Sequence, residues 1–221
     1  GRPDIIERRL EKANLRIKPG VDFDIINPEF DERYRECWQA YHKLMVRRGV
    51  TPAIAKDALR RKPTVIGAML LKLGYADGLI CGLSGQFSHH LGVIQNIIGK
   101  RNGVNTMAAM NYLMLHGRSL FICDTHVNEN PDAQEIAEMT LMAAEQVKRF
   151  GLQPKVALLS HSNFGSSNSE SARKMGVAAG LIGAMSAGEL EVDGEMHGDS
   201  ALDEGIRREA NPDSPLKGEA N

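Results

Sequence analysis

The chain has 221 residues, of which 27 are Lys or Arg, 28 are Asp or Glu, and 42% are hydrophobic. This near-balance of charge excludes a strongly basic nucleic-acid binder, whose affinity would come from a surplus of Lys and Arg. Residues 1–62 hold 15 of the basic and 10 of the acidic residues, so any attraction for an anionic ligand is expected to be local. Because no apolar stretch reaches the ~20 residues of a membrane span, we expect no membrane partner and a cytoplasmic protein.

The three cysteines, Cys37, Cys81 and Cys123, form neither a CxxC pair nor a Cys/His array. A zinc knuckle or a disulfide framework is therefore not expected, and the compartment is predicted to be reducing. Cys81 and Cys123 stand in apolar runs. The sequence predicts that both are small buried hydrophobic residues.

Residues 1–62 are predicted to form a helical, charged part with one candidate strand at 21–27. A helix over 29–48 carries three aromatic residues at spacings of four and three, which places them on one face: Tyr34, Trp38 and Tyr41. This stripe is typical of a packing surface, with a subunit interface as the alternative. Thr51-Pro52 has the pattern of a helix start, a hydroxyl N-cap followed by Pro.

From residue 63 to 221 short strands and longer helices are predicted to alternate. The expected strands are 78–81, 119–123, 155–160 and 190–192, and the expected helices are 64–73, 88–98, 130–150 and 169–185. Such alternation indicates βα units around a parallel sheet. We therefore predict an α/β fold with three layers and a largely parallel sheet. The Pro- and Gly-containing residues 211–221 are expected to be the most flexible part.

The sharpest candidate for a ligand site is the loop 160–169, because ligands of α/β sheets collect where strands end. Seven of the eight residues 162–169 are Ser, Asn or Gly. A strand, a small-residue turn and a helix N-terminus together present backbone N–H groups and hydroxyls to an anion. The alternative is an N-cap with spare hydroxyls. The candidate anion contacts are Ser160, Ser162, Asn163, Gly165 and Ser166.

Neither G-x-x-x-x-G-K-[ST] nor G-x-G-x-x-G occurs in the chain, which disfavours nucleoside triphosphate hydrolysis and a dinucleotide site. A second polar loop, 82–90, contains Ser84 and Ser88, which we expect across a cleft from the first loop. Its adjacent His89 and His90 point in different directions and make a poor metal pair.

Asp124 follows a predicted strand and either holds a turn through backbone N–H groups or binds a ligand. Residues 193–199 supply three carboxylates and His197, a set that suggests a divalent metal or an acid/base pair. Because no fixed metal-binding motif occurs, no metal ligand is predicted. Asp124, Asn128 and His197 are expected to shape the cleft.

Five segments resemble the phosphate acetyl/butyryl transferase family: 76–82, 121–128, 156–166, 193–199 and 214–221. The version most similar to this chain is the transferase-like domain fused behind bacterial NADP-dependent malic enzymes. True transferases carry a turn like Ser-x-Ser-Thr where this chain has Ser160-His161-Ser162-Asn163. The resemblance covers nearly all of the chain.

The resemblance implies the two-lobed architecture shared with isocitrate dehydrogenase, with acyl-CoA and phosphate meeting between the lobes. It implies a family domain that continues on both sides of this fragment. The parent enzyme would convert malate to pyruvate with NADP and Mg²⁺ or Mn²⁺, through an N-terminal part outside this chain. The fragment itself would need no cofactor, would form homo-oligomers and would bind acetyl-CoA.

The chain differs from active transferases in the helix that binds phosphate in those enzymes. They carry an Arg there, whereas residues 88–95 contain none, and their catalytic Ser/Arg/Asp element falls beyond Asn221. Losing a guanidinium loses a bidentate phosphate contact and its stabilisation of transition-state charge. The favoured function is therefore an acetyl-CoA-sensing, oligomerising domain of a malic enzyme. The alternatives are an active phosphate acetyltransferase and a purely structural dimerisation module.

Overall fold

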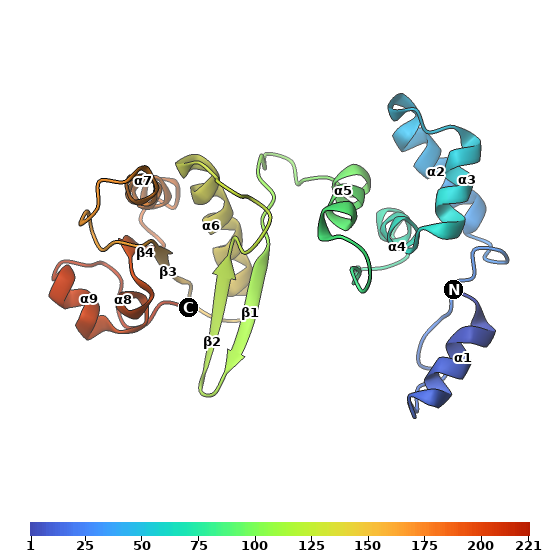
Figure 1. Cartoon of the computed structure of the whole chain (residues 1–221), viewed down its shortest axis with the longest axis horizontal. Coiled ribbons are helices and arrows are strands. Elements are labelled where there is room, and N and C mark those ends of the chain that lie inside the picture. Colours follow the sequence, from blue (N-terminus) through green and yellow to red (C-terminus); the bar gives the residue numbers. More distant parts are fainter. The chain divides into compact units, whose positions relative to one another are not determined.

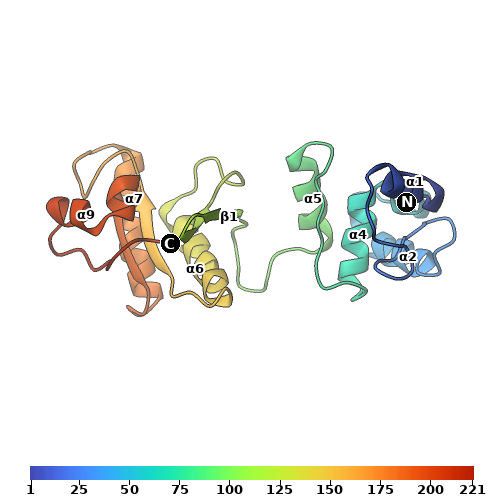
Figure 2. The same ribbon diagram turned by 90° about the horizontal axis from the view of Figure 1, so that it is seen from below.

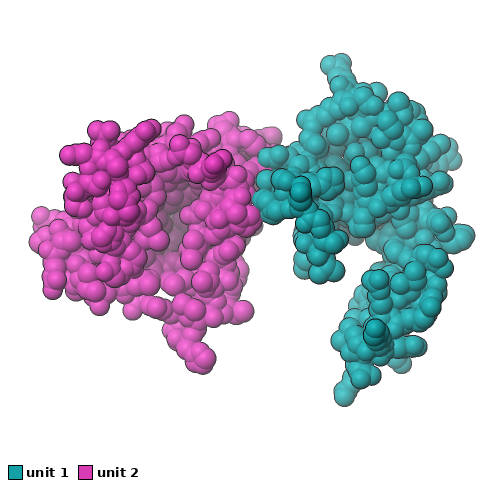
Figure 3. Space-filling model, viewed as in Figure 1, with its two compact units in different colours: residues 1–99 teal, residues 100–221 magenta.

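The computed structural model describes residues 1–221 (Figure 1, and turned by 90° in Figure 2). They group into two units, residues 1–99 and residues 100–221, coloured separately in Figure 3. The boundary does not fall at residue 62, because the helices on either side of that residue share one core. No helix is long and apolar enough to cross a membrane.

The first unit is built of helices. They are α1 (Pro3–Lys12), α2 (Tyr34–Met45), the short 3₁₀ helix η1 (Val46–Arg48), α3 (Pro52–Arg61), α4 (Pro63–Lys72) and α5 (Phe87–Ile97). The Thr51 hydroxyl accepts a hydrogen bond from the Ile54 amide, which confirms the predicted start of α3. The aromatic stripe of α2 packs against the buried cluster of this unit, as the helical spacing predicted.

Both strands expected in the first unit are absent. Residues 21–27 contribute only an isolated bridge between Pro19 and Phe23. Residues 78–81 form no strand, and Ile80 is fully exposed at 101%. A strand is stable only beside another strand that completes its hydrogen bonds, and this unit offers none.

The second unit contains all four strands. In chain order its elements are β1 (Met110–Leu115), β2 (Arg118–Cys123), α6 (Ala133–Arg149), β3 (Lys155–Leu159), α7 (Glu170–Met185), β4 (Glu191–Met196), α8 (Gly198–Leu202) and α9 (Glu204–Ala210). β1 and β2 form an antiparallel hairpin, with Met110 opposite Cys123 and Leu115 opposite Arg118. β3 and β4 pair in parallel, and α7 connects them.

Helices cover one face of the β3–β4 pair, and α8 with the C-terminal segment covers the other. Leu158 and Val192 pack with α6 and α7 in one cluster, and α6 and α7 lie side by side (Figure 2). On the opposite face Ala157 packs with Met196 and Leu216. Alternate residues of a strand point to opposite faces, so this pair is the middle of three layers and the predicted α/β class is confirmed. The strands form two two-stranded sheets, one antiparallel and one parallel, where a largely parallel sheet was predicted. The two-lobed arrangement stays a prediction.

Three details of the second unit differ from expectation. Strand β1 was not predicted. Helix α6 begins at a capping box formed by Asp132 and Glu135 rather than at residue 130. The segment 211–221 is anchored rather than loose, because Leu216 is fully buried and the buried Arg207 guanidinium donates to its carbonyl.

Candidate functional site

The serine-rich loop after β3 is built around an internal carboxylate. Glu195 of β4 is buried at 4% exposure. Its Oε1 accepts hydrogen bonds from the Ser162 hydroxyl and from the Gly165 amide, each at 2.9 Å. The preceding residue, Gly194, permits the close approach of β4 to β3, because a Cβ there would lie 2.6 Å from the Leu158 carbonyl oxygen. The pairing of β3 with β4 also shifts register at this point.

The expectation that this loop offers free backbone amides is wrong for its central turn. The Phe164 amide donates to the Glu195 carbonyl, and the Ser166 amide donates to the Asn163 carbonyl. Phe164 and Gly165 both have positive φ, at 45° and 84°, a left-handed turn that aims the Gly165 amide inward at Glu195. The carboxylate that fills the turn lies 30 residues further along the chain, so local sequence did not reveal it.

Two predicted residues meet on the outer side of the loop. The His197 amide donates to Asn163 Oδ1 at 2.7 Å, and Asn163 Nδ2 lies 3.2 Å from His197 Nδ1. Ser162 is buried, whereas Gly165 and Ser166 are exposed. Asn163 therefore ties the loop to the end of β4, and the predicted cluster is split between a buried and an exposed group.

Asp124 holds the loop that follows β2. Its Oδ2 accepts from the Asn128 amide at 2.7 Å and from the Asn128 side chain at 2.6 Å. Its Oδ1 accepts from the amides of Ala109 and Val127. Burial raises the pKa of Asp124, but these hydrogen bonds together outweigh burial and leave the pKa below its usual value. Of the two roles left open, turn-holding is the one that these contacts support.

A cavity of about 550 Å³ lies where β2 and β3 end. It brings together three of the predicted residues, Asp124, Asn128 and Ser160. Such a place, beyond the carboxyl ends of strands, is where α/β proteins bind ligands. We take this cavity as the candidate functional site. It is lined by the first residues of the loop 160–169 and not by the turn 162–166, where the site was predicted.

Sequence reasoning missed five polar residues of this cavity: Glu129, Thr140, His161, Ser171 and Lys174. Lys174 Nζ donates to Asn130 Oδ1 at 2.7 Å and forms no ion pair with a carboxylate. His161 Nε2 lies 3.2 Å from the Ser169 hydroxyl. The signal for Ser171 and Lys174 was their i, i+3 spacing in the first turns of α7, which puts both on one helix face.

Ser84 and Ser88 belong to the first unit, and their predicted position across a cleft stays a prediction. Both are exposed. The neighbouring His90 has a structural role, because Nδ1 lies 2.8 Å from the Thr64 hydroxyl and Nε2 lies 2.7 Å from the Ser84 carbonyl. This agrees with the expectation that His90 is satisfied by hydrogen bonds rather than by a metal.

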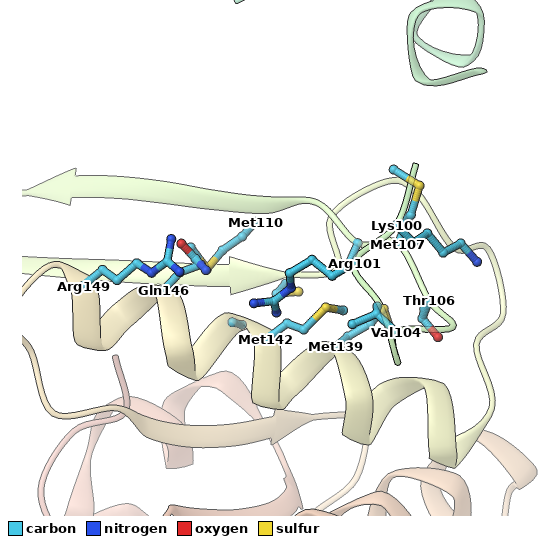
Figure 4. Close-up of a pocket in the computed structure, with 13 residues that line it drawn as sticks. Lys100, Arg101, Val104, Thr106, Met107, Met110, Met139, Met142, Gln146 and Arg149 are labelled. Carbon is cyan, nitrogen blue, oxygen red and sulfur yellow. The ribbon is translucent and has the colours of Figure 1, made fainter. Parts of the chain in front are cut away.

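A second cavity, of about 340 Å³, lies between β1 and α6, and four methionines are among the residues that line it (Figure 4). Figure 4 shows Met139 and Met142 rising from α6 towards Arg101. Arg101 and Arg149, the guanidinium groups at this cavity, both form ion pairs with Glu145. One carboxylate does not balance two guanidinium groups, and Lys100 also lines this cavity, so its lining keeps a surplus of positive charge. The cavity at the strand ends stays the candidate because of its place in the fold.

The cysteines differ from their predicted burial. Cys37 is buried, whereas Cys81 and Cys123 are exposed. Cys81 stands in the segment that formed no strand, and Cys123 ends β2 at the edge of the cavities. Although part of Cys123 is exposed, burial of its thiol raises the pKa to about 11, with the Asp124 carboxylate adding to the effect. No group of three or more His, Cys, Asp or Glu residues is close enough to hold a metal ion.

The α/β fold agrees with that of solved proteins. Residues 1–221 match the family described as phosphate acetyl/butaryl transferase. The chain therefore belongs to this family, as the five segments predicted. A phosphotransacetylase structure, EutD from Staphylococcus aureus, superposes with a TM-score of 0.84 at 27% identity, covering 100% of this chain and 66% of that one.

Within the family, the chain is similar to part of the malic enzymes. It is 54% identical to the NADP-dependent malic enzyme of Escherichia coli and 51% identical to the NAD-dependent malic enzyme of Rhizobium meliloti, over 221 residues in each case. These alignments cover 100% of this chain and 29% of each relative. The predicted likeness to the transferase-like region of malic enzymes is thus confirmed.

Proposed function

We propose that this chain is the acyl-CoA-sensing and assembly region of a malic enzyme, with acetyl-CoA as its ligand. The observation that carries the proposal is the 550 Å³ cavity at the ends of β2 and β3, whose lining includes the hydroxyls of Ser160 and Ser171 and Lys174, which bonds to Asn130 and not to a carboxylate. Asp124 and Glu129 also line this cavity, so the attraction for the phosphates of an acyl-CoA is local to Lys174. No Arg lines this cavity, which favours binding over turnover.

Regulation requires acetyl-CoA to bind one arrangement of the enzyme more tightly than another. The resulting coupling is typically ~1–3 kcal/mol between the two sites. Malate oxidation, with NADP and Mg²⁺ or Mn²⁺, would be carried out by residues outside this chain. The support for that part is the similarity to malic enzymes over the full length of the chain.

The test uses the longer enzyme that contains this chain. Acetyl-CoA binding is measured by calorimetry, and malate-dependent NADPH formation is measured with and without saturating acetyl-CoA. Lys174→Gln is expected to weaken acetyl-CoA binding about 10- to 100-fold, the loss of a hydrogen bond to a charged group. The control is Lys148→Gln, an exposed residue of α6 outside the cavity. Unchanged binding by Lys174→Gln, or malate kinetics indifferent to acetyl-CoA, would refute the proposal.

Homo-oligomeric assembly is the second part of the proposal. It is supported by the exposed apolar residues of segment 78–87, where Ile80 and Leu83 are fully accessible to solvent. Apolar groups of this size at a surface favour contact with another protein. Sedimentation of the longer enzyme and of its Leu83→Asp variant tests this, and a wild-type monomer would contradict it. If acetyl-CoA, CoA and phosphate all fail to bind an oligomer, the chain is a structural dimerisation module.

An active phosphate acetyltransferase is the competing function, and family membership favours it. It predicts CoA-dependent release of phosphate from acetyl phosphate. The assay is run on the longer enzyme and on Lys174→Gln. Release above the blank that Lys174→Gln abolishes would favour this function, and no release would remove it.

A further inference from the structure

The 340 Å³ cavity between β1 and α6 combines an apolar lining with a surplus of positive charge. All of its lining residues belong to the second unit. Eight of the 13 are hydrophobic, including the four methionines Met107, Met110, Met139 and Met142. No Asp or Glu lines this cavity, whereas three cations do: Lys100, Arg101 and Arg149.

The two guanidinium groups at this cavity share a single carboxylate. Arg101 Nη1 donates to both oxygens of Glu145, at 2.9 and 3.2 Å, and Arg149 Nη2 donates to Oε1 at 3.0 Å. Figure 4 shows Arg101 and Arg149 extending over α6 towards each other. Together with Glu145 they carry one net positive charge, which matches a ligand with one negative charge.

The arginines also have hydrogen-bond donors to spare. Arg101 Nε and Nη2 make no hydrogen bond in the structure, and Arg149 uses only Nη2. All three charged side chains are exposed, by 43% to 65%. Ion pairs between exposed groups contribute little stability, so Arg101 can turn part of its planar fork to a second carboxylate without much loss.

The rest of the lining favours an alkyl chain over a phosphate. A phosphate needs donors on several sides, but most of the residues around this cavity are hydrophobic. Methionine side chains are flexible and adapt to apolar ligands of different shape. At the ~30 Å³ that a water-sized group occupies, a cavity of about 340 Å³ has room for about ten carbon and oxygen atoms.

We propose that this cavity binds an amphipathic monoanion, a carboxylate with an unbranched alkyl chain of about eight carbons in all. The carboxylate bonds to Arg101 and Arg149, and the chain lies among the methionines. Octanoate, with ten non-hydrogen atoms, is the probe for this class of ligand.

This site adjoins the candidate functional site but differs from it in its charged residues. Met139 and Cys123 line both cavities, whereas Arg101 and Arg149 line only this one and Lys174 lines only the other. The inference does not rest on the proposed function. Lys174→Gln is therefore expected to leave octanoate binding unchanged, so failure of one proposal is distinguishable from failure of the other.

Calorimetry with butanoate, hexanoate, octanoate and decanoate on the longer protein that contains this chain tests the apolar part. Each added methylene is expected to strengthen binding about fourfold up to octanoate, with one ligand bound per chain. Decanoate should gain little more, because the cavity is then full. Binding that does not depend on chain length, or that inorganic phosphate displaces, overturns the proposal.

The charged part is tested with Arg101→Met, at an exposed position where folding should be kept. We expect this variant to bind octanoate about tenfold more weakly and to bind uncharged octanol no more weakly than the wild type does. Arg101→Lys, which keeps the charge but lacks the planar fork, should be intermediate.

Lys148→Met is the matched control, because it removes the same charge from an exposed residue of α6 outside the cavity. It should bind octanoate as the wild type does. Equal weakening by Arg101→Met and Lys148→Met would mean that octanoate responds only to the overall charge of the protein, and would overturn the proposal. Octanoate binding that Arg101→Met leaves unchanged would overturn it as well.

Discussion

The Ser162 hydroxyl and the Gly165 amide donate to the same oxygen of Glu195, each over 2.9 Å. The loop therefore has the anion-binding geometry that its composition predicted, but the anion is a side chain of the protein. Charge-assisted hydrogen bonds of this kind are stronger than neutral ones. Glu195 thereby fixes the shape of the loop whose first residue, Ser160, borders the candidate site.

Replacing Glu195 with Ala is expected to lower the free energy of unfolding by about 2–4 kcal/mol, because a buried hydroxyl and a backbone amide lose their acceptor. Chemical denaturation measures the loss. Acetate or phosphate is expected to restore part of the stability of Glu195→Ala by entering the vacated turn. Glu195→Gln, which keeps an acceptor oxygen, is the control and should lose less. A Glu195→Ala protein as stable as the wild type would contradict this role.

The lowered pKa of Asp124 is expected to make the stability of the protein depend on pH. Its folded pKa lies below the unfolded value of ~3.9, so its ionised form is favoured in the folded protein. The contribution is present above the unfolded pKa and is lost as the pH falls through the folded pKa. Asp124→Asn should therefore be less stable than the wild type at pH 7, by about 1–3 kcal/mol, and the difference should shrink towards pH 2.

Denaturation at pH 7 and at pH 2 measures the Asp124 effect as a difference between proteins, which cancels the titration of other carboxyl groups. Asp213→Asn, at an exposed position of the C-terminal segment, is the matched control. If Asp124→Asn lost the same amount of stability at both pH values, the charge of Asp124 would not be what stabilises the loop.

Elements with strong local signals were predictable from sequence. The Thr51-Pro52 start of α3, the strand 155–159 and the Ser169 cap of α7 all depend on neighbouring residues. The strand at 78–81 failed because its stability depends on a partner that the unit does not contain. Apolar composition alone did not reveal that absence.

The candidate site was likewise predictable only where its residues follow from local sequence. The polar residues at the ends of β2 and β3 were found because strand order brings such ends together. The acceptor for the loop amides was missed because Glu195 is distant in sequence and reaches the turn only through the pairing of β3 with β4. Lys174 was missed because the sequence does not show which face of α7 borders the cavity, and this became clear only once the position of α7 was known.

Thiol reactivity is expected to separate the two exposed cysteines. With a pKa of about 11, the Cys123 thiol stays protonated at pH 8, and the thiolate is the reactive form. Cys81 should therefore be alkylated first by iodoacetamide, and the Cys123 rate should rise about tenfold per pH unit until its pKa is reached. Mass spectrometry of the labelled peptides gives both rates, with Cys81→Ser removing the fast one. Equal rates at pH 8 would disprove the raised pKa.

Arg207 is expected to be the residue that anchors the C-terminal segment. It is fully buried, and its guanidinium donates to the carbonyls of Ser200, Leu216 and Gly218. Arg207→Met keeps apolar bulk but leaves these carbonyls without donors, so we expect a loss of about 3–5 kcal/mol in the free energy of unfolding. Arg207→Lys should be intermediate, since an ammonium group lacks the planar fork that reaches several acceptors.

The neighbouring Arg208 provides the control for Arg207. It is exposed and pairs with Glu204 one helical turn away, a contact worth about 0.5 kcal/mol or less. Arg208→Met should thus unfold near the wild-type midpoint. Because Leu216 and Gly218 lead directly to Asn221, hydrogen exchange over 216–221 should also accelerate in Arg207→Met and not in Arg208→Met. Equal midpoints and equal exchange in the two variants would mean that the segment is held by the burial of Leu216 rather than by the guanidinium.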